Sequence, residues 1–380
     1  MSGGFGVYVH WPFCTAKCPY CDFNSHVRTA IDESGWLDAI VSELDYVAHL
    51  QGAARPAVET IFFGGGTPSL MSGKAVGHIL DRIAQLWPAA DDVEITLESN
   101  PASADGARFR DYRDAGVNRL SLGVQALNDA DLKMLGRLHD VAEAKGALRL
   151  AMDTFERVSL DLIYARPQQT VEAWRSELRE ALAFGTEHLS LYQLTIEPAT
   201  PFATLYKTGA LKIPNDDLAA ALYETTQEMT EAVGLSAYEI SNHARAGAQS
   251  RHNLLYWRYG EYVGVGPGAH GRLDLAGKRI ATSCERLPER WREKVATNGN
   301  AMEMTDIEND DAAHEHLLMQ LRLTEGIDLT AYAARWGRAP DQARIAALAE
   351  EGLVSCREHR LAATPRGRLV LNSVIAALAD

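Results

Sequence analysis

The sequence lacks any run of about 18 consecutive apolar residues, the length that a transmembrane helix needs. Its first residues, MSGGFGVYVHWP, also lack the basic start and long apolar stretch of a secretory signal peptide. At 380 residues the chain is too long for one ordinary small core. We therefore expect a soluble, cytoplasmic protein without an integral membrane segment, built from one large domain and one smaller domain.

An excess of basic residues is also absent. The chain has 37 Lys and Arg against 51 Asp and Glu, which gives a formal net charge of −14. A negatively charged surface repels phosphate backbones unless a local basic patch overrides the repulsion. We therefore expect no nucleic-acid partner.

Cysteines are few and unevenly placed. Of the five, Cys14, Cys18 and Cys21 lie within eight positions, and Phe23 stands where a fourth could have followed. An odd number with three packed together argues against a secreted disulfide framework and for a metal or cluster site in a reducing compartment. Cys284 and Cys356 lie far from this group, and we interpret them as small apolar residues.

Short runs rich in β-branched and aromatic residues alternate with segments of helical periodicity. The runs occupy residues 6–10, 58–63, 93–99, 118–124, 157–164 and 188–194. This rhythm predicts parallel βα units with right-handed crossovers, and six such units form a partial (β/α)6 barrel of the α/β class. Sites in such barrels lie at the C-terminal ends of the strands, which here are polar or rich in glycine.

The last part of the chain has a different pattern of predicted helices and strands. Residues 301–380 read as helices, a two-stranded wing and a final helix, which resembles a small winged-helix module. This part carries more acidic than basic residues, so a packing or lid role is favoured over DNA binding. We divide the chain into a barrel with the cysteine loop (1–235), a connecting segment (236–300) and a winged-helix-like C-terminal domain (301–380). The glycine-rich GEYVGVGPGAHG of the connecting segment is interpreted as a loop that approaches a ligand or the barrel mouth closely, or equally as a structural turn.

The three cysteines have the form C-x3-C-x2-C, with Tyr20 directly before the last. They could bind zinc with His10 or His26 as the fourth ligand. Three thiolates also suit a four-iron cluster, which leaves one iron open for a non-protein ligand. The spacing, in a loop after the first strand of a βα series, resembles the radical S-adenosylmethionine (SAM) superfamily and so favours the 4Fe-4S cluster.

This resemblance implies that the open iron binds the amino and carboxylate groups of SAM. The GGGTP sequence one strand after the cysteine loop lets backbone groups approach a ligand closely. Acidic and amide side chains can bind its amino or hydroxyl groups, and an arginine its carboxylate. The SAM contacts that the resemblance implies are Tyr8, Gly65, Gly66, Thr67, Glu98, Gln125, Arg137 and Asp161.

Longer motifs narrow the resemblance to one family. VYVHWPFC, FFGGGTPSL, LESNP, SLGVQALND, LGRLHD and LSLYQLTIEPATPF occur in the order typical of the oxygen-independent coproporphyrinogen III oxidases (HemN) and the related HemW heme chaperones. The match covers nearly the whole chain. The sequence DLIYARPQQT departs from the more usual DLIYGLPGQT at Ala165, Arg166 and Gln168.

Two features separate the branches of this family. The oxidase pattern has a further cysteine two residues after the third, so Phe23 argues against the decarboxylating enzyme. The sequence HNLLYW, from His252 to Trp257, matches the HNxxYW motif typical of the chaperones. His252 offers an imidazole to heme iron, and Tyr256 and Trp257 offer flat surface to a porphyrin. A lone histidine beside aromatic residues is more often a buried, hydrogen-bonded residue, so the heme assignment depends on the family match.

We therefore predict a HemW-type heme chaperone that binds heme and transfers it to target hemoproteins, respiratory ones among them. The 4Fe-4S cluster and SAM then have regulatory, structural or assisting roles, and no catalytic residue is assigned. The prediction includes an electron donor as a partner and is compatible with a homodimer. One alternative is an oxygen-independent coproporphyrinogen III oxidase, and another is a zinc-stabilised barrel without radical chemistry.

Overall fold

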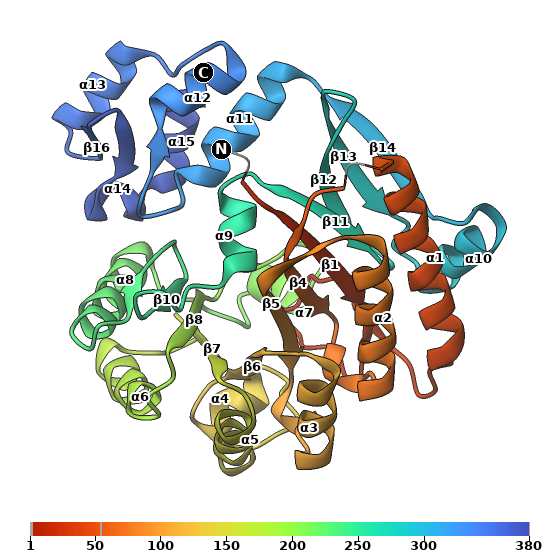
Figure 1. The fold of residues 1–380 in the computed structure, drawn as a ribbon. Helices are drawn as coiled ribbons and strands as arrows, with labels where there is room; N and C mark the ends of the chain where they lie inside the picture. Colours follow the sequence, from red (N-terminus) through yellow and green to blue (C-terminus); the bar gives the residue numbers. More distant parts are fainter. Residues whose placement is uncertain (1–2, 54, 380) are drawn as a thin grey trace.

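The structure, a computed structural model, describes residues 3–53 and 55–379 and is built around one twelve-stranded sheet (Figure 1). Six neighbouring strands of this sheet pair in parallel and curve into a partial barrel. They are β1 (Phe5–Trp11), β4 (Val58–Gly65), β5 (Ala89–Ser99), β6 (Arg119–Gln125), β7 (Arg157–Tyr164) and β8 (His188–Gln193). The predicted α/β partial barrel is confirmed, and the sheet stays open because β1 and β8 pair with additional strands instead of each other.

Helices cover the outer face of the barrel strands (Figure 1). The main ones are α1 (Glu33–Gln51), α2 (Gly73–Leu86), α3 (Gly106–Ala115), α5 (Val141–Thr154), α6 (Val171–Ala183) and α8 (Asp216–Glu231). The short helices α4 (Asp129–Met134) and α7 (Pro201–Lys207) follow β6 and β8. Side-chain caps start these helices, as at α5, where Asp140 and Glu143 form a capping box. Their apolar faces pack on the sheet and build its main core.

The sheet extends beyond the barrel at both ends. On one side β11 (Glu261–Val265) pairs in parallel with β1, and β12 (His270–Leu275), β13 (Lys278–Cys284) and β14 (Met302–Ile307) follow antiparallel. On the other side lie β10 (Asn242–Ala244) and β9 (Ser236–Ala237). Helix α10 (Pro288–Asn298) packs beside α1.

The interpretation of GEYVGVGPGAHG as a loop was wrong for residues 261–265, which form β11. Glycine here reflects close contact between backbones: a Cβ on Gly264 would overlap the backbone of His270. Only the turn between β11 and β12 is a loop, and there a Cβ on Gly266 would collide with the backbone of His10. A Cβ on Gly268 in the same turn would collide with the side chain of Asn24, so the stretch reaches the cysteine loop, although most of it is sheet.

The C-terminal domain has its own small core and confirms the predicted winged-helix-like fold. Its helices are α11 (Asn309–Gln320), α12 (Leu329–Trp336), α13 (Gln342–Glu350), α14 (Pro365–Leu369) and α15 (Leu371–Ala379). A three-stranded sheet of β15 (Ile327–Asp328), β17 (Arg360–Ala363) and β16 (Val354–Arg357) contains the predicted wing. Helix α9 (Arg251–Trp257) lies between this domain and the barrel (Figure 1).

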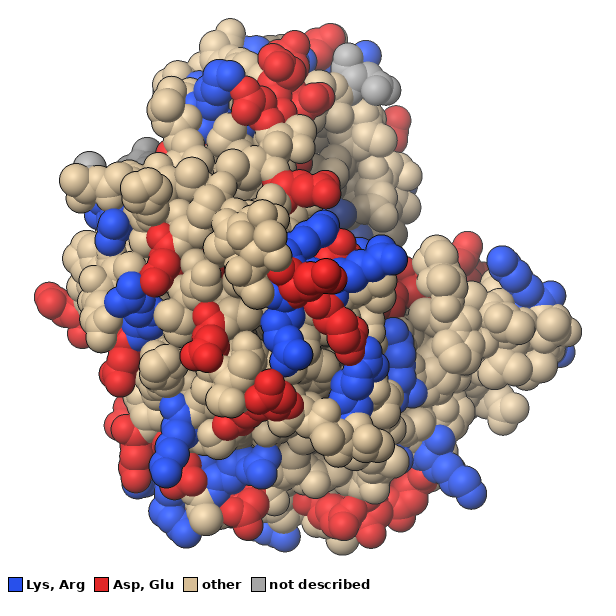
Figure 2. Space-filling view, turned by 90° about the vertical axis from the view of Figure 1, so that its right-hand side faces the viewer, with Lys and Arg blue, Asp and Glu red and all other residues tan. Residues whose placement is uncertain are grey.

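Figure 2 shows acidic and basic side chains interspersed over one face of the protein, and that face has no continuous basic surface. Within residues 3–53 and 55–379, no helix is both long enough and apolar enough to cross a membrane.

The loop after β7 holds two non-glycine residues in the left-handed region, Ala165 with φ of 55° and Gln168 with φ of 62°. These are the positions at which the more usual motif has glycine. Because a side chain is strained there by about 1 kcal/mol, the substitution Gln168→Gly at this exposed position should raise the free energy of unfolding by roughly 0.5–1 kcal/mol. Urea denaturation measures the change. Gln168→Ala shortens the side chain without freeing φ, and an equal gain in that control would contradict the explanation.

Candidate functional site

A cavity of about 500 Å³ opens at the C-terminal ends of the barrel strands, beside the cysteine loop. It gathers all the residues predicted to bind the cluster or SAM except Tyr8. They are Cys14, Cys18, Cys21, Gly65, Gly66, Thr67, Glu98, Gln125, Arg137 and Asp161. The ends of neighbouring parallel strands meet at one edge of the sheet, which is why positions far apart in the sequence converge here.

The cysteine loop is closed at its base by the short parallel pair β2 (Phe13–Cys14) and β3 (His26–Val27). Two sulfur atoms accept hydrogen bonds: Cys14 Sγ from Thr67 Oγ1 at 3.3 Å, and Cys18 Sγ from Arg137 Nη1 at 3.5 Å. Burial raises the pKa of the Cys14 and Cys21 thiols. An iron ligand must be a thiolate, so a bound metal centre has to compensate for this burial. Donors aimed at the sulfurs are typical of sites that hold iron–sulfur clusters.

The surroundings of the loop fit a cluster better than a single zinc ion. Among the residues that the structure describes, no group of three or more His, Cys, Asp or Glu side chains is close enough to hold one metal ion. His10, a candidate zinc ligand, already bonds through Nδ1 to Tyr8 Oη at 3.0 Å and through Nε2 to Asn24 O at 2.9 Å. In a four-iron cluster each thiolate binds a different iron, so the sulfur atoms can lie farther apart than around one ion.

Asn24 also ties the cysteine loop to the turn between β11 and β12. Its Nδ2 donates to Pro267 O at 2.8 Å and to Arg286 O at 2.8 Å, and its Oδ1 lies 3.2 Å from His26 Nε2. His26, the other candidate zinc ligand, is therefore engaged through its Nε2. The loop is held from both β1 and the sheet extension.

The glycine run after β4 is required for packing as well as for access to the cavity. A Cβ on Gly65, whose φ is 110°, would lie 2.7 Å from the His10 ring. A Cβ on Gly66 would lie 2.7 Å from the carbonyl oxygen of Phe13. The end of β4 can approach β1 and the cysteine loop this closely only because these residues lack side chains. The sequence suggested only the approach of a ligand.

Two half-buried carboxyl groups, Glu98 and Asp161, line the cavity. Asp161 accepts hydrogen bonds from Ser121 Oγ at 2.9 Å and Ser159 Oγ at 3.0 Å. Burial, together with the neighbouring Asp161, raises the pKa of Glu98 to about 8, while Arg119 opposes the rise. Burial likewise raises the pKa of Asp161. A cationic ligand such as an ammonium or sulfonium group would favour the ionised forms and would therefore bind well here.

The sequence analysis missed the two serines. Ser121 and Ser159 occupy inward positions of β6 and β7, as their register with each other shows. The signal was present in the alternating runs RLSLGV and RVSLDL, in which serine recurs among apolar residues with the period of a strand.

The raised pKa of Glu98 predicts how stability depends on pH in the unliganded protein. Between the ordinary carboxyl pKa and about 8, folded Glu98 holds a proton that the unfolded chain releases. Its contribution is therefore present at low pH and is lost as pH rises. The contribution of Glu98 to the free energy of unfolding should fall by roughly 1–2 kcal/mol from about pH 6.5 to about pH 8.

The substitution Glu98→Gln should flatten this fall, measured by urea denaturation at several pH values. Buried histidines act in the opposite direction, because groups such as His10, whose folded pKa burial lowers to about 4, bind protons near pH 6.5 only in the unfolded chain. The difference between the two pH profiles therefore isolates the contribution of Glu98. An unchanged pH profile in the variant would contradict the assignment.

Gln125 and Arg137 form the wall beside the cysteines. Gln125 has φ of 77° and lies at a register shift between β6 and β7, a bulge that turns its side chain out of the regular strand pattern. Arg137 Nη2 donates to Gly123 O at 2.7 Å, whereas its buried Nε has no hydrogen-bond partner in the described residues. That free donor suits an anionic group such as a carboxylate.

His252 lies inside the barrel, away from this cavity. Its side chain is 1% exposed, and both ring nitrogens are engaged: Nδ1 with Thr60 Oγ1 at 2.8 Å and Nε2 with Tyr256 Oη at 2.7 Å. The ring stacks on Phe62 with centroids 5.1 Å apart, and Tyr8 stacks beside it at 6.4 Å. Burial lowers the pKa of His252 to about 3, so the imidazole is neutral.

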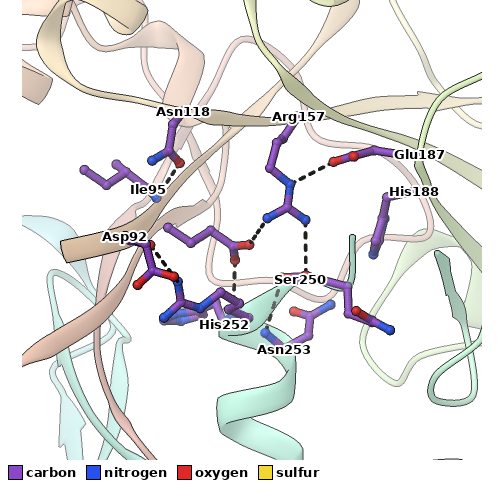
Figure 3. Close-up of polar contacts among 12 residues, drawn as sticks. Asp92, Ile95, Asn118, Arg157, Glu187, His188, Ser250, His252 and Asn253 are labelled. Atoms are coloured by element: carbon purple, nitrogen blue, oxygen red, sulfur yellow. Dashed lines mark hydrogen bonds and ion pairs between the residues drawn. The ribbon is translucent and has the colours of Figure 1, made fainter. Parts of the chain in front are cut away.

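An ionic network docks α9 against the N-terminal ends of the barrel strands (Figure 3). Glu94 Oε1 accepts from the His252 backbone at 3.2 Å, and its Oε2 pairs with Arg157 Nη1 at 3.1 Å. Arg157 also pairs with Glu187 at 2.8 Å. Together with the Ser250 cap on Asn253, at 3.3 Å, these contacts make α9 a lid on this end of the barrel. The sequence analysis missed this network.

Comparison with known proteins connects both parts of the chain to described families. Residues 8–181 match the radical SAM superfamily, and residues 307–370 match the HemN C-terminal domain. The heme chaperone HemW of Escherichia coli (strain K12) is 38% identical over 377 residues, covering 97% of this chain and 96% of that protein. The mitochondrial radical S-adenosyl methionine domain-containing protein 1 of Bos taurus is 37% identical, covering 98% and 86%. The solved structure of coproporphyrinogen III oxidase (HemN) from Escherichia coli has a TM-score of 0.83 and 22% identity, covering 99% and 90%, and supports the fold.

Proposed function

Because the chain belongs to the HemW family, within the radical SAM superfamily, we propose that it is a heme chaperone that binds heme and transfers it to target hemoproteins. The observation that carries this proposal is the similarity to HemW chaperones over nearly the full length of both proteins. Phe23 supports it, because this residue lies 60% exposed at the cavity where the oxidase pattern places a further cysteine.

The cavity at the C-terminal ends of the strands is the proposed site of the cluster and SAM. Cys14, Cys18 and Cys21 would hold a 4Fe-4S cluster, which when bound supplies an open iron site and an electron. Arg137 would orient the carboxylate of SAM through its free Nε, and the carboxyl groups of Glu98 and Asp161 would favour a cationic ligand. Gly65, Gly66, Thr67 and Gln125 would complete the wall, and Tyr8 would support it from beneath through its bond to His10.

Heme ligation by His252 requires a change in the structure. An imidazole nitrogen binds iron only if it gives up its hydrogen bond. The bond from Nε2 to Tyr256 lies within α9, whereas the bond from Nδ1 to Thr60 ties α9 to β4. We therefore propose that α9 leaves the end of the barrel when heme binds. Its departure would free His252 Nδ1 from Thr60 and expose the imidazole with the ring of Tyr256 on the same helix, and it would uncover the ring of Phe62 on β4.

The remaining partners follow from this role. An electron donor would reduce the cluster, and recipient hemoproteins, including respiratory ones, would accept the heme. We place the protein in the cytoplasm, where thiolates stay reduced, and a homodimer remains part of the proposal.

The test is to rebuild the cluster anaerobically and to offer heme and coproporphyrinogen III in separate reactions. We expect retained heme, detected by its Soret band, and its transfer to apomyoglobin as a probe acceptor. We expect no SAM-dependent formation of protoporphyrinogen. Turnover of coproporphyrinogen without heme transfer would overturn the proposal in favour of the oxidase.

A further inference from the structure

A buried ionic cluster lies behind the wall of the cavity, where the loops after β6 and β7 meet α6. At its centre is Arg166, which is 1% exposed. Its guanidinium pairs with Glu177 and, at 3.0 Å, with Asp131. In the usual motif of the family this position is leucine, whose side chain could not form these ion pairs.

The guanidinium also holds two backbone carbonyls. Arg166 Nη1 donates to Ile163 O at 2.9 Å and to Gln125 O at 3.4 Å. Ile163 and Gln125 both line the cavity. Gln125 has the left-handed φ described above, a conformation that persists only where the surroundings fix it.

Glu177 completes the connection between the two loops. Its Oε1 accepts from Leu127 N at 2.7 Å and from Arg166 Nη1 at 3.0 Å. Gln169 joins the same cluster, because its Oε1 accepts from Arg166 N at 3.2 Å and its Nε2 donates to Glu177 at 3.4 Å. The segment that carries Gln125 is thus fastened to the loop after β7 by side chains that a leucine could not replace.

We propose that Arg166 is a positioning residue for the SAM site, which fixes the backbone of Gln125 so that the Gln125 side chain is presented to the ligand. This inference rests on the proposed binding of SAM in the cavity. It assigns a function to one of the residues at which the sequence departs from the family motif.

The test compares Arg166→Leu, Arg166→Lys and the control Arg175→Leu in the protein with its cluster rebuilt. Arg175 is also an arginine paired with a glutamate, but it lies on the exposed face of α6. We expect SAM to bind at least about tenfold more weakly to Arg166→Leu, with unchanged iron content. Arg166→Lys should be intermediate, because a lysine keeps the charge but not the forked geometry. The control should bind SAM as the unmodified protein does.

Hydrogen–deuterium exchange of residues 124–131 without SAM is the second measurement. Exchange should rise in Arg166→Leu and not in the control. If Arg166→Leu does not fold, Arg166→Leu combined with Glu177→Gln and Asp131→Asn removes the unpaired buried charges and should show the same two effects. Unchanged SAM affinity or unchanged exchange in a folded variant would overturn the inference. If the unmodified protein binds no SAM, the proposed function of the cavity fails, and exchange alone decides whether Arg166 holds the Gln125 segment.

Discussion

Replacing Cys18 by serine should lower the bound iron from about four atoms per chain to less than about one after anaerobic reconstitution. The structure places Cys18 on the cavity wall with a hydrogen bond from Arg137, between the other two cysteines of the loop. A serine hydroxyl is a poor substitute for a thiolate, and two remaining thiolates leave two irons without protein ligands. Iron and acid-labile sulfide analysis, with the visible spectrum, measures the loss.

Cys356→Ser is the matched control for this prediction. Cys356 is an exposed cysteine on β16 of the C-terminal domain, so its replacement should leave the iron content unchanged. Full retention of iron in Cys18→Ser would show that the loop does not hold the cluster.

His252→Ala should abolish the Soret band of bound heme, the second large effect that we expect. The same substitution should lower the free energy of unfolding by roughly 2–4 kcal/mol, because it empties a buried site and leaves the hydroxyls of Thr60 and Tyr256 without their partner. Spectra after gel filtration report heme, and urea denaturation reports stability. A destabilised variant that keeps its full Soret band would show that His252 is a core residue and not a ligand.

Thr60→Val separates ligation from packing. This substitution removes the hydrogen bond that ties His252 Nδ1 on α9 to β4, while leaving the imidazole and the aromatic surface in place. If α9 must open before heme binds, the variant should take up heme faster, in stopped-flow mixing, and should still show a Soret band. Slower uptake would argue against the proposed opening.

The barrel and its cavity could be predicted because their signals are local and repeated. Each barrel strand appears as a short apolar run, and parallel topology brings the strand ends together whatever the loops between them do. Glu98, Gln125 and Asp161 were found in this way, at the ends of β5, β6 and near the end of β7. The family resemblance added the cysteine spacing and the identity of the cofactors.

The surroundings of His252 could not be predicted in the same way. Its partners Thr60 and Glu94 lie more than 150 positions earlier in the chain, and only tertiary packing brings them to α9. The extension of the sheet was missed for a related reason. In β11 the glycines meet neighbouring backbones, which sequence periodicity does not reveal. Arg166 was visible only as a departure from a motif, whereas its pairing with Glu177 required the fold.

The parallel strands β1 and β11 run from the end of the barrel where α9 lies to the end that carries the cysteine loop. β1 passes from Gly6, beside the His252 ring, to the cysteine loop, and β11 begins just after α9 and ends at the turn held by Asn24. Strands are stiff along their length, so a displacement of α9 is either carried to the cysteine loop or absorbed within these two strands. If the displacement of α9 is carried to the cysteine loop, heme bound at one end of the barrel and SAM bound at the other would alter each other's affinity by the same factor. The pair of strands β1 and β11 would then couple the two binding sites.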